Sequence, residues 1–330
     1  MRPNVVALGH GYWGRNIVRN LASLEVLRGI YEPDEAMRNE AKILYPNTLF
    51  YQHEQEIWED DKAIAVAIGT PAIHHARLAL RAMAAGKDVF VEKPLALTLD
   101  EGQRMVTAAQ ETNRVLMVGH LLEYHPAITQ LRQWIDEGIL GDLQYIYSNR
   151  LNLGKFRREE NILWSFAPHD LAILLRLIQQ MPTEVVATGG AYLTPGVADI
   201  TTTNLRFDNG IQAHIFVSWL HPYKEQKLVV VGSQKMVVFD DQAPWDQKLT
   251  LFDKGADWVD NVPIPRQGIG RSVTLLPKEP LLEELRHFID RVGDRKPPLT
   301  DGDSGLRVLK VLHAAQYSLQ QNGIPVSVHP

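Results

Sequence analysis

The sequence predicts an α/β fold in two parts. The first is an N-terminal doubly wound parallel sheet, and the second is a C-terminal α/β domain with a large, open-faced, mostly antiparallel sheet. Over residues 1–120, short apolar runs alternate with helical patterns, as expected of a parallel sheet with crossover helices. From 185 to 258, apolar and polar residues alternate with a period of two, which is typical of antiparallel hairpins with one covered face. We therefore expect domains over residues 1–121 and 122–330.

The composition excludes several classes of protein. The 330 residues carry a formal net charge of −5, which argues against a protein that binds nucleic acid through its phosphates. There is no cysteine, so a disulfide framework, a thiol nucleophile and a cysteine-ligated metal are excluded. No apolar run reaches the roughly 18 residues of a membrane span, and nothing resembles a signal peptide. We expect a cytoplasmic protein with neither membrane nor nucleic acid as a partner.

A glycine-rich turn follows the first strand. The apolar run at 5–8 ends in the pattern Gly-x-Gly-x-x-Gly, after which apolar residues recur at helical spacing. Gly9 allows a sharp bend, Gly11 leaves room for a pyrophosphate, and Gly14 lets the helix pack closely on the strand. Glu32 ends a second apolar run about 20 residues later, where an acid that binds a ribose belongs. This pattern predicts a Rossmann-type site for NAD, since a carboxylate repels the 2′-phosphate of NADP. The residues expected to bind the cofactor here are Gly9, Gly11, Tyr12, Trp13, Gly14 and Glu32.

Later elements of the first domain continue the alternation. We expect helices at 34–44, 71–85 and from 99 onward, with strands at 49–51, 63–68, 88–91 and 114–118. Gly86 ends the second of these helices, and Thr98 with Glu101 forms a capping box before the third.

Polar residues follow three of these strands. Ligands gather outside the carboxyl ends of parallel strands, so these residues should line the cofactor site. His74 is balanced between a cofactor contact and a structural role, and His120 between a cofactor contact and a hinge between the domains. His75 faces elsewhere and is expected to be structural. The cofactor contacts expected at these strand ends are Thr70, Pro71, His74, Glu92, Lys93 and His120.

The second domain begins with helices and a strand. We expect a helix at 126–137, a strand at 143–147, a polar and basic stretch at 149–161, and closing helices at 281–291 and 304–321. A further helix carries His169 and continues to Gln180. Pro168 suits the first position of that helix, which places His169 in the first turn. The positive end of the helix dipole then keeps its imidazole neutral and able to accept a proton.

The motifs together resemble the Gfo/Idh/MocA oxidoreductases. The glycine turn, Gly69-Thr70-Pro71 with His74, Glu92-Lys93-Pro94 and the helix with His169 fall in the family's order over essentially the whole chain. Gly-Tyr-Trp-Gly and the runs 148–154 and 161–170 resemble the branch that acts on sugar nucleotides.

The resemblance implies an NAD-dependent enzyme that oxidises a CH–OH group. It implies that Lys93 and His169 are catalytic, with His169 as the base and Lys93 stabilising the alkoxide; the two roles can be exchanged. Ser165 stands where the family often has an aspartate, which puts in doubt any scheme that needs a carboxylate there. The Lys93–Pro94 bond is a candidate for the cis form, which the family often has.

The implied substrate is a UDP-sugar oxidised at C3, UDP-N-acetylglucosamine above all, whose ketone feeds amination in lipid A or other glycan synthesis. Arginines near the catalytic helix offer positive charge for a diphosphate; a solvated basic loop or a subunit contact is the alternative. The substrate-binding residues expected are Lys93, Tyr124, Arg150, Arg157, Arg158, Asn161, Ser165 and His169.

Other functions stay open at this point. A polyol or inositol dehydrogenase of the same family is one alternative, and a non-catalytic NAD-binding regulator is another. No residues show metal-ligand spacing, so no metal is expected. We expect functional coupling to an aminotransferase and a homotetramer that buries the open sheet face. The sequence does not decide which sugar, which carbon or which direction of reaction applies.

Overall fold

The computed structural model describes residues 3–154 and 156–328 and has the predicted α/β architecture. The chain forms two compact units, Met1–Tyr124 with Glu279–Leu309, and His125–Lys278 with Lys310–Pro330. The sequence analysis places one boundary, after residue 121. The structure breaks the chain after Tyr124 and returns a later segment, Glu279–Leu309, to the first unit.

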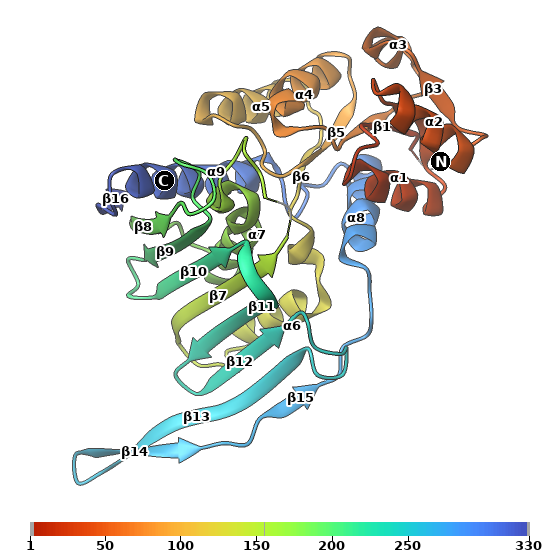
Figure 1. Ribbon diagram of the computed structural model, residues 1–330. Coiled ribbons are helices and arrows are strands. Elements are labelled where there is room, and N and C mark those ends of the chain that lie inside the picture. Colours follow the sequence, from red (N-terminus) through yellow and green to blue (C-terminus); the bar gives the residue numbers. More distant parts are fainter. Residues whose placement is uncertain (1–2, 155, 329–330) are drawn as a thin grey trace. The chain divides into compact units, whose positions relative to one another are not determined.

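The first unit contains a six-stranded parallel sheet in the order β3-β2-β1-β4-β5-β6 (Figure 1). The order reverses between β1 and β4, which is where doubly wound sheets bind ligands. Its strands are β1 Val5–Leu8, β2 Leu27–Tyr31, β3 Leu49–Tyr51, β4 Ala65–Ile68, β5 Asp88–Glu92 and β6 Leu116–Gly119. Its helical elements up to Tyr124 are α1 Gly14–Ser23, α2 Glu35–Leu44, α3 Glu54–Glu59, η1 Ala72–His74, α4 His75–Ala84, α5 Leu99–Glu111 and η2 Leu121–Tyr124.

A late helix completes the core of this unit. Helix α8, Pro280–Asp294, packs its apolar side against the sheet strands and α1. The rings of Phe90 on β5 and Phe288 on α8 lie 5.9 Å apart, and Leu285 is fully buried in the same cluster. Large apolar side chains of this kind each contribute about 1.5–3 kcal/mol by leaving water. The sheet is therefore held by residues far from it in the sequence.

Two local predictions for the first unit are confirmed. Thr98 caps α5 and exchanges hydrogen bonds with Glu101 as a capping box. The Lys93–Pro94 peptide bond is cis.

The second unit contains a ten-stranded sheet in the order β14-β13-β12-β11-β7-β10-β9-β8-β16, with β15 beside β13. The pairs are antiparallel except β7 with β10, which is parallel. The strands are β7 Leu143–Leu153, β8 Glu184–Gly190, β9 Ile200–Arg206, β10 Gln212–Ser218, β11 Leu220–Gly232, β12 Lys235–Asp240, β13 Leu249–Val259, β14 Val262–Gln267, β15 Arg271–Val273 and β16 Val326–Ser327. Its helices are α6 Pro126–Asp136, α7 Ile162–Ile178 and the second half of α9 Gly302–Gln320.

One face of this sheet is covered and the other is open. Side chains alternate between faces along a strand, and Ser148 of β7 faces α7, where its hydroxyl donates to Asp170 at 2.6 Å. Tyr147 therefore lies on the other face, which we call the open face. There its ring stacks on that of His214 on β10, with centroids 5.1 Å apart.

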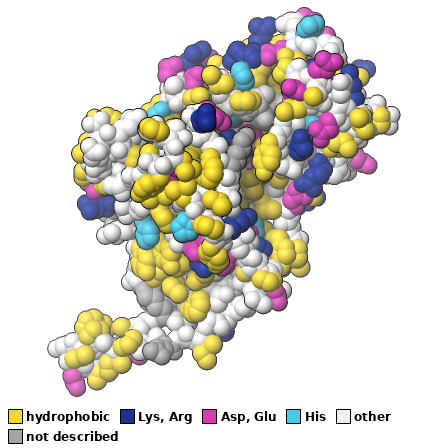
Figure 2. Space-filling view, in the orientation of Figure 1, with side chains coloured by type: hydrophobic (Ala, Val, Ile, Leu, Met, Phe, Trp, Pro, Cys, Tyr) yellow, Lys and Arg dark blue, Asp and Glu magenta, His cyan; other side chains and the backbone are white. Residues whose placement is uncertain are grey.

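The β13–β14 hairpin extends past the other strands of the sheet (Figure 1). Its turn residues Asp260 and Asn261 both have positive φ, 51° and 62°, as a two-residue hairpin turn that matches strand twist requires. Figure 2 shows hydrophobic side chains gathered at the tip of this hairpin, among them the exposed Trp258 and Val262. No helix in the part of the chain described is long and apolar enough to cross a bilayer.

Candidate active site

The glycine turn has the geometry that its sequence predicts. Gly9 has a φ of +96°, which favours glycine, and a Cβ on Gly14 would lie 2.3 Å from the Gly9 carbonyl oxygen. Position 11 is different, because a Cβ there would meet nothing within 4 Å. The turn is thus tight where α1 meets β1 and open at Gly11. Helix α1 starts at Gly14 without a side-chain cap, so its first N–H groups can face an anion.

Glu32 fixes the turn to the end of β2. Its carboxylate accepts the backbone N–H of His10 at 2.6 Å and that of Asp34 at 2.9 Å. The side chain is 6% exposed. Each oxygen retains a further lone pair for a ribose hydroxyl. The acid therefore lies beside the glycine turn, as the sequence analysis expects of a ribose-binding residue.

Glu92, the last residue of β5, is buried beside the same turn. Its carboxylate accepts the indole N–H of Trp13 at 2.5 Å and the backbone N–H of Lys93 at 3.3 Å. Burial raises the pKa of Glu92 to about 7, although the Trp13 hydrogen bond and the charge of Lys93 oppose this. A Cβ on Gly119 would lie 3.0 Å from the carboxylate, so glycine at the end of β6 makes room for it.

The indole contact is a role that sequence reasoning missed. The glycine pattern predicts only that Trp13 binds the cofactor, because the pairing with Glu92 joins residues 79 positions apart. No local signal in the sequence predicts it.

The strand ends at β4 and β6 carry polar groups with few protein partners. The Thr70 hydroxyl is buried and has no hydrogen-bond partner among the described residues. Both ring nitrogens of the buried His120 are likewise without one within residues 3–154 and 156–328. Burial, and secondarily Lys93, lowers the pKa of His120 to about 3, so its ring is neutral. Pro71 and His74 are exposed nearby in the chain, and His75 is buried.

The structure corrects the start of the helix that carries His169. Helix α7 begins at Ile162, and Pro168 lies well inside it. Asn161 is the N-cap, where its side chain accepts the N–H of Trp164 at 3.2 Å. The prediction that Pro168 begins the helix is wrong, and the argument that the helix dipole holds His169 neutral falls with it.

The first turn of α7 is stabilised by a residue that is distant in the sequence. The side-chain oxygen of Gln316 on α9 accepts from the amide of Asn161 at 2.8 Å and from the indole of Trp164 at 3.0 Å. A cap signal was present in the sequence, since Asn161 directly precedes an apolar run. Pro168 leaves the Trp164 carbonyl without its usual helical donor.

Ser165 and His169 share a side of α7, because residues four apart lie above one another on a helix. Ser165 is buried and His169 is partly buried. Asp170 points elsewhere, toward Ser148 and Arg150.

Arg150 has a structural partner in place of the predicted diphosphate. Its guanidinium binds both carboxylate oxygens of Asp170, at 2.7 and 3.1 Å, and the two side chains are 12% and 1% exposed. The covered face of the sheet therefore neutralises this charge internally. The expectation that Arg150 contacts substrate is corrected on this ground.

The other expected substrate residues differ in their exposure and in whether they already pair with another protein side chain. Arg157 pairs with Glu160 at 3.0 Å and stays partly exposed, and Arg158 is exposed. Lys155, in the same basic stretch, lies outside the described residues. Tyr124, in the first unit, has its hydroxyl 3.1 Å from that of Thr300, and burial raises its pKa.

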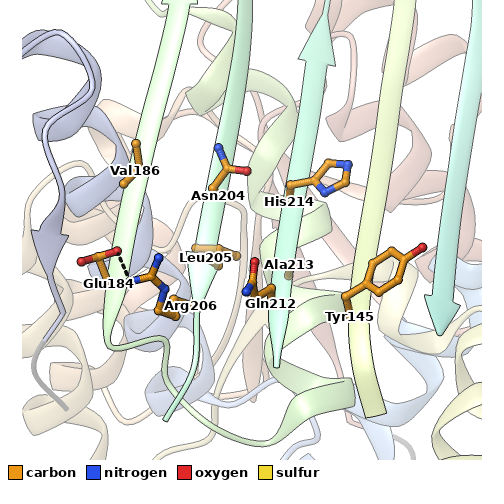
Figure 3. Close-up of a pocket in the computed structure, with 9 residues that line it drawn as sticks. All are labelled: Tyr145, Glu184, Val186, Asn204, Leu205, Arg206, Gln212, Ala213 and His214. Carbon is orange, nitrogen blue, oxygen red and sulfur yellow. Dashed lines mark ion pairs between the residues drawn. The ribbon is translucent and has the colours of Figure 1, made fainter. Parts of the chain in front are cut away.

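A cavity of about 330 Å³ opens on the second unit's sheet, on the open face (Figure 3). An ion pair of 3.2 Å between Arg206 and Glu184 lies at one side of it. His214 and Tyr145 point away from α7, so this cavity lies on the opposite face of the sheet from the helix that carries His169. The lining residues are Tyr145, Glu184, Val186, Asn204, Leu205, Arg206, Gln212, Ala213 and His214. Within the described residues, no group of three or more His, Asp or Glu side chains is arranged to hold a metal ion.

Comparison with known proteins places both units. Residues 4–120 match an oxidoreductase family with an NAD-binding Rossmann fold, and residues 128–238 match the GFO/IDH/MocA C-terminal domain. UDP-N-acetylglucosamine 3-dehydrogenase of Acidithiobacillus ferrooxidans is 29% identical over 315 residues, which cover 94% of this chain and 94% of that protein. The NAD(+)-dependent scyllo-inositol 2-dehydrogenase of Bacillus subtilis is 27% identical over 285 residues, covering 83% and 80%.

A solved structure shows the same fold. The crystallised UDP-N-acetylglucosamine 3-dehydrogenase from Acidithiobacillus ferrooxidans superimposes with a TM-score of 0.85. The match covers 97% of this chain and 99% of that one at 24% identity. Both the parallel sheet and the large mostly antiparallel sheet predicted from the sequence are thereby confirmed as a known combination.

Proposed function

The chain belongs to the Gfo/Idh/MocA family of NAD-binding oxidoreductases, and from this premise we propose that it oxidises the C3 hydroxyl of UDP-N-acetylglucosamine. The observation that carries the proposal is the match along 94% of both chains to a dehydrogenase of that substrate. Two inositol dehydrogenases are less similar in sequence: the one from Bacillus subtilis is 27% identical over 83% of this chain, and the one from Thermotoga maritima is 24% identical over 97%. A polyol substrate is therefore the second candidate.

The glycine turn and its neighbours fit NAD. The open side at Gly11 leaves space beside the backbone, while the α1 N-terminus presents N–H groups suited to a pyrophosphate. Glu32 offers a carboxylate next to that turn, suited to ribose hydroxyls. The chemistry that NAD supplies when bound is acceptance of a hydride from the substrate carbon.

Two side chains serve as the catalytic groups in this proposal. Oxidation of an alcohol needs a base for the hydroxyl proton and a group that stabilises the developing alkoxide. We assign the ammonium of Lys93, directly after β5, to hold the hydroxyl oxygen. We assign a ring nitrogen of His169 to receive the proton. The reverse assignment uses the same two residues.

The diphosphate of the substrate requires cations. Arg157 and Arg158 supply them in the stretch before α7, and Arg158 is exposed. Asn161 is the N-cap of α7, so it fixes the end of this stretch. With Arg150 bound to Asp170, the proposal rests on the two later arginines.

The experiment is product analysis by mass spectrometry after incubation with NAD and UDP-N-acetylglucosamine. We expect a 3-keto nucleotide sugar and NADH in small amounts, because oxidation of such an alcohol by NAD is uphill. Addition of an aminotransferase with an amino donor should increase turnover by consuming the ketone. Equal reaction of N-acetylglucosamine without UDP would transfer the proposal to the polyol substrate. Absence of NADH with a full panel of alcohols would leave a non-catalytic NAD-binding regulator.

The same proposal includes an assembly and a location. The open face presents the stacked rings of Tyr145, Tyr147 and His214, a surface suited to burial against another copy, and we propose a homotetramer. Light scattering after gel filtration tests the tetramer, and a monomeric mass contradicts it.

We place the reaction in the cytoplasm, where activated sugars are made. The following step in this proposal is amination of the ketone for lipid A or another glycan.

A further inference from the structure

The ring of His75 lies between two backbone carbonyl groups. Its Nδ1 is 2.9 Å from the carbonyl oxygen of Pro94, and its Nε2 is 2.9 Å from that of Thr70. Thr70 follows β4 by two residues, and Pro94 follows Lys93 after β5. One side chain thus contacts the loops at the ends of two neighbouring parallel strands.

The position of His75 makes these contacts rigid. It is the first residue of α4 and is 1% exposed. A buried aromatic ring at the start of a helix has little freedom to turn, because close packing surrounds it. Any movement of either loop relative to α4 therefore changes a hydrogen-bond distance at this ring.

We propose that His75 is a positioning residue that ties the loop after β4 to the loop after β5 and thereby fixes Lys93 for catalysis. The inference rests on the proposed role of Lys93, and it adds a residue that acts through the backbone. Sequence analysis expected His75 to be structural; the two carbonyl contacts specify what it holds.

The chemistry of the contacts defines the best substitutions. A carbonyl oxygen only accepts hydrogen bonds, so His75 binds a loop only through a ring N–H: an imidazolium can donate to both carbonyls, and a neutral ring to one of them. Burial, and then the positive charges of Lys93 and His74, lower the pKa of His75, whereas the two carbonyls raise it. A neutral ring has one N–H and an imidazolium has two. A glutamine side chain carries two N–H groups on one nitrogen, and phenylalanine keeps a ring but has none.

The experiment compares His75→Phe with His75→Gln. A misplacement of about 1 Å costs on the order of 10²-fold in rate, so we expect His75→Phe to lower kcat by about 10- to 100-fold. The effect should fall on kcat more than on the KM for NAD. His75→Gln should recover part of the loss, because its amide nitrogen can donate to one of the two carbonyls. His53→Phe is the matched control, since His53 is exposed at the start of α3 in the same unit.

A second measurement separates this inference from the proposed function. Hydrogen exchange followed by mass spectrometry reports on the peptides after β4 and β5 without any substrate. We expect His75→Phe to increase exchange in both peptides and to leave exchange around β2 unchanged. Faster exchange in both with unchanged kcat would show the tie but overturn its role in positioning Lys93, while Lys93→Ala tests the proposed role of Lys93 separately. Unchanged exchange in both peptides would overturn the inference whatever the activity.

Discussion

The indole N–H of Trp13 donates to the carboxylate of Glu92 at 2.5 Å, which joins the glycine turn after β1 to the end of β5. Trp13 lies in the turn after β1 and Glu92 ends β5, and these two strands flank β4 in the sheet. The contact crosses the point where the strand order reverses. The contact forms one side of the candidate cofactor site. Its acceptor is Glu92, whose pKa is raised to about 7.

Replacement of Trp13 by phenylalanine should destabilise the protein in a pH-dependent way. The ring remains, but the buried carboxylate loses a donor, which costs about 1.5–3 kcal/mol when the acceptor is charged. We expect the larger loss at pH 8.5, where Glu92 is ionised, and a smaller loss at pH 5.5. Urea unfolding of the variant at both pH values measures it, with Trp58→Phe on α3 as the control. Equal losses at both pH values would mean that the indole acts through packing alone.

Glu284 should make the protein less stable at alkaline pH. It is fully buried on α8, and neither carboxyl oxygen has a hydrogen-bond partner in the described part of the chain. Burial, and then Glu92 and Glu123, raise its pKa well above the usual value. An acid with a raised folded-state pKa stabilises fully below its unfolded pKa, and this contribution is lost as the pH rises through the folded pKa. We expect the melting temperature to fall from pH 5 upward.

The stability contribution of Glu92 depends on pH in the same direction. Its pKa is raised from 4.5 to about 7, which corresponds to roughly 3 kcal/mol of folding stability lost between these pH values.

Glu284→Gln keeps the shape of the side chain without the charge. We expect its stability to match the wild type at pH 5 and to exceed it at pH 9. Differential scanning calorimetry across this range measures both proteins. A variant that loses stability with pH as steeply as the wild type would contradict the assignment to Glu284.

Cofactor choice should depend on Glu32. Its carboxylate lies beside the glycine turn and repels a 2′-phosphate, so we expect NAD to be preferred over NADP. Glu32→Ala should raise the KM for NAD and reduce the preference for NAD over NADP. Part of the effect arises because the N–H groups of His10 and Asp34 lose their acceptor. Steady-state kinetics with both cofactors test this, with Glu35→Ala on the exposed side of α2 as the control. A wild-type protein that uses both cofactors equally would show the prediction to be wrong.

Loss of either proposed catalytic group should reduce turnover strongly. We expect Lys93→Ala and His169→Ala each to lower kcat by about 10² to 10⁴, the range for a lost acid or base. Affinity for NAD should stay close to that of the wild type, because the expected phosphate and ribose contacts lie at the glycine turn and Glu32. Fluorescence titration with NADH checks binding separately from turnover. An active His169→Ala protein would transfer the base to Lys93 or to another residue.

Arg150, in β7, and Arg158, between β7 and α7, should differ in how their replacement affects stability and the KM for the UDP-sugar. Arg150→Met leaves Asp170 buried without its cation, which costs about 3–5 kcal/mol, and should leave the KM for the UDP-sugar nearly unchanged. Arg158→Ala removes an exposed charge and should raise that KM with no change in stability. Thermal unfolding and kinetics on both variants provide the comparison. A stable Arg150→Met protein with a raised KM would restore Arg150 as a substrate ligand.

The glycine turn, the parallel strands and the α5 cap are predictable because each depends on neighbours in the sequence. Gly9, Gly11 and Gly14 lie within one turn, and Thr98 and Glu101 exchange hydrogen bonds across three residues. Alternating patterns likewise predict the sheet of the second unit. The register of its pairs and the parallel pairing of β7 with β10 do not follow from such patterns.

The residues that sequence reasoning misplaced are fixed by distant partners. Arg150 reads as a free cation until Asp170 on α7 is found opposite it. Pro168 reads as a helix start because its ring is favourable there, whereas the contacts of Asn161 and Trp164 with Gln316 extend the helix backward. The roles of Trp13 and His75 also depend on residues from other strands. Local rules state which contacts each of these side chains can make, and they leave its actual partner undetermined.

The late position of α8 has a consequence for biosynthesis. Phe90 and Met117 are synthesised early, yet they share their buried cluster with Leu285 and Phe288, which the ribosome adds only after strands β7 to β15 of the second sheet. Until then the nascent first unit exposes apolar surface of the kind that chaperones bind. A fragment that ends at residue 121 keeps that surface exposed permanently. The protein's first half therefore reaches its native state only when the translation of the chain is almost complete.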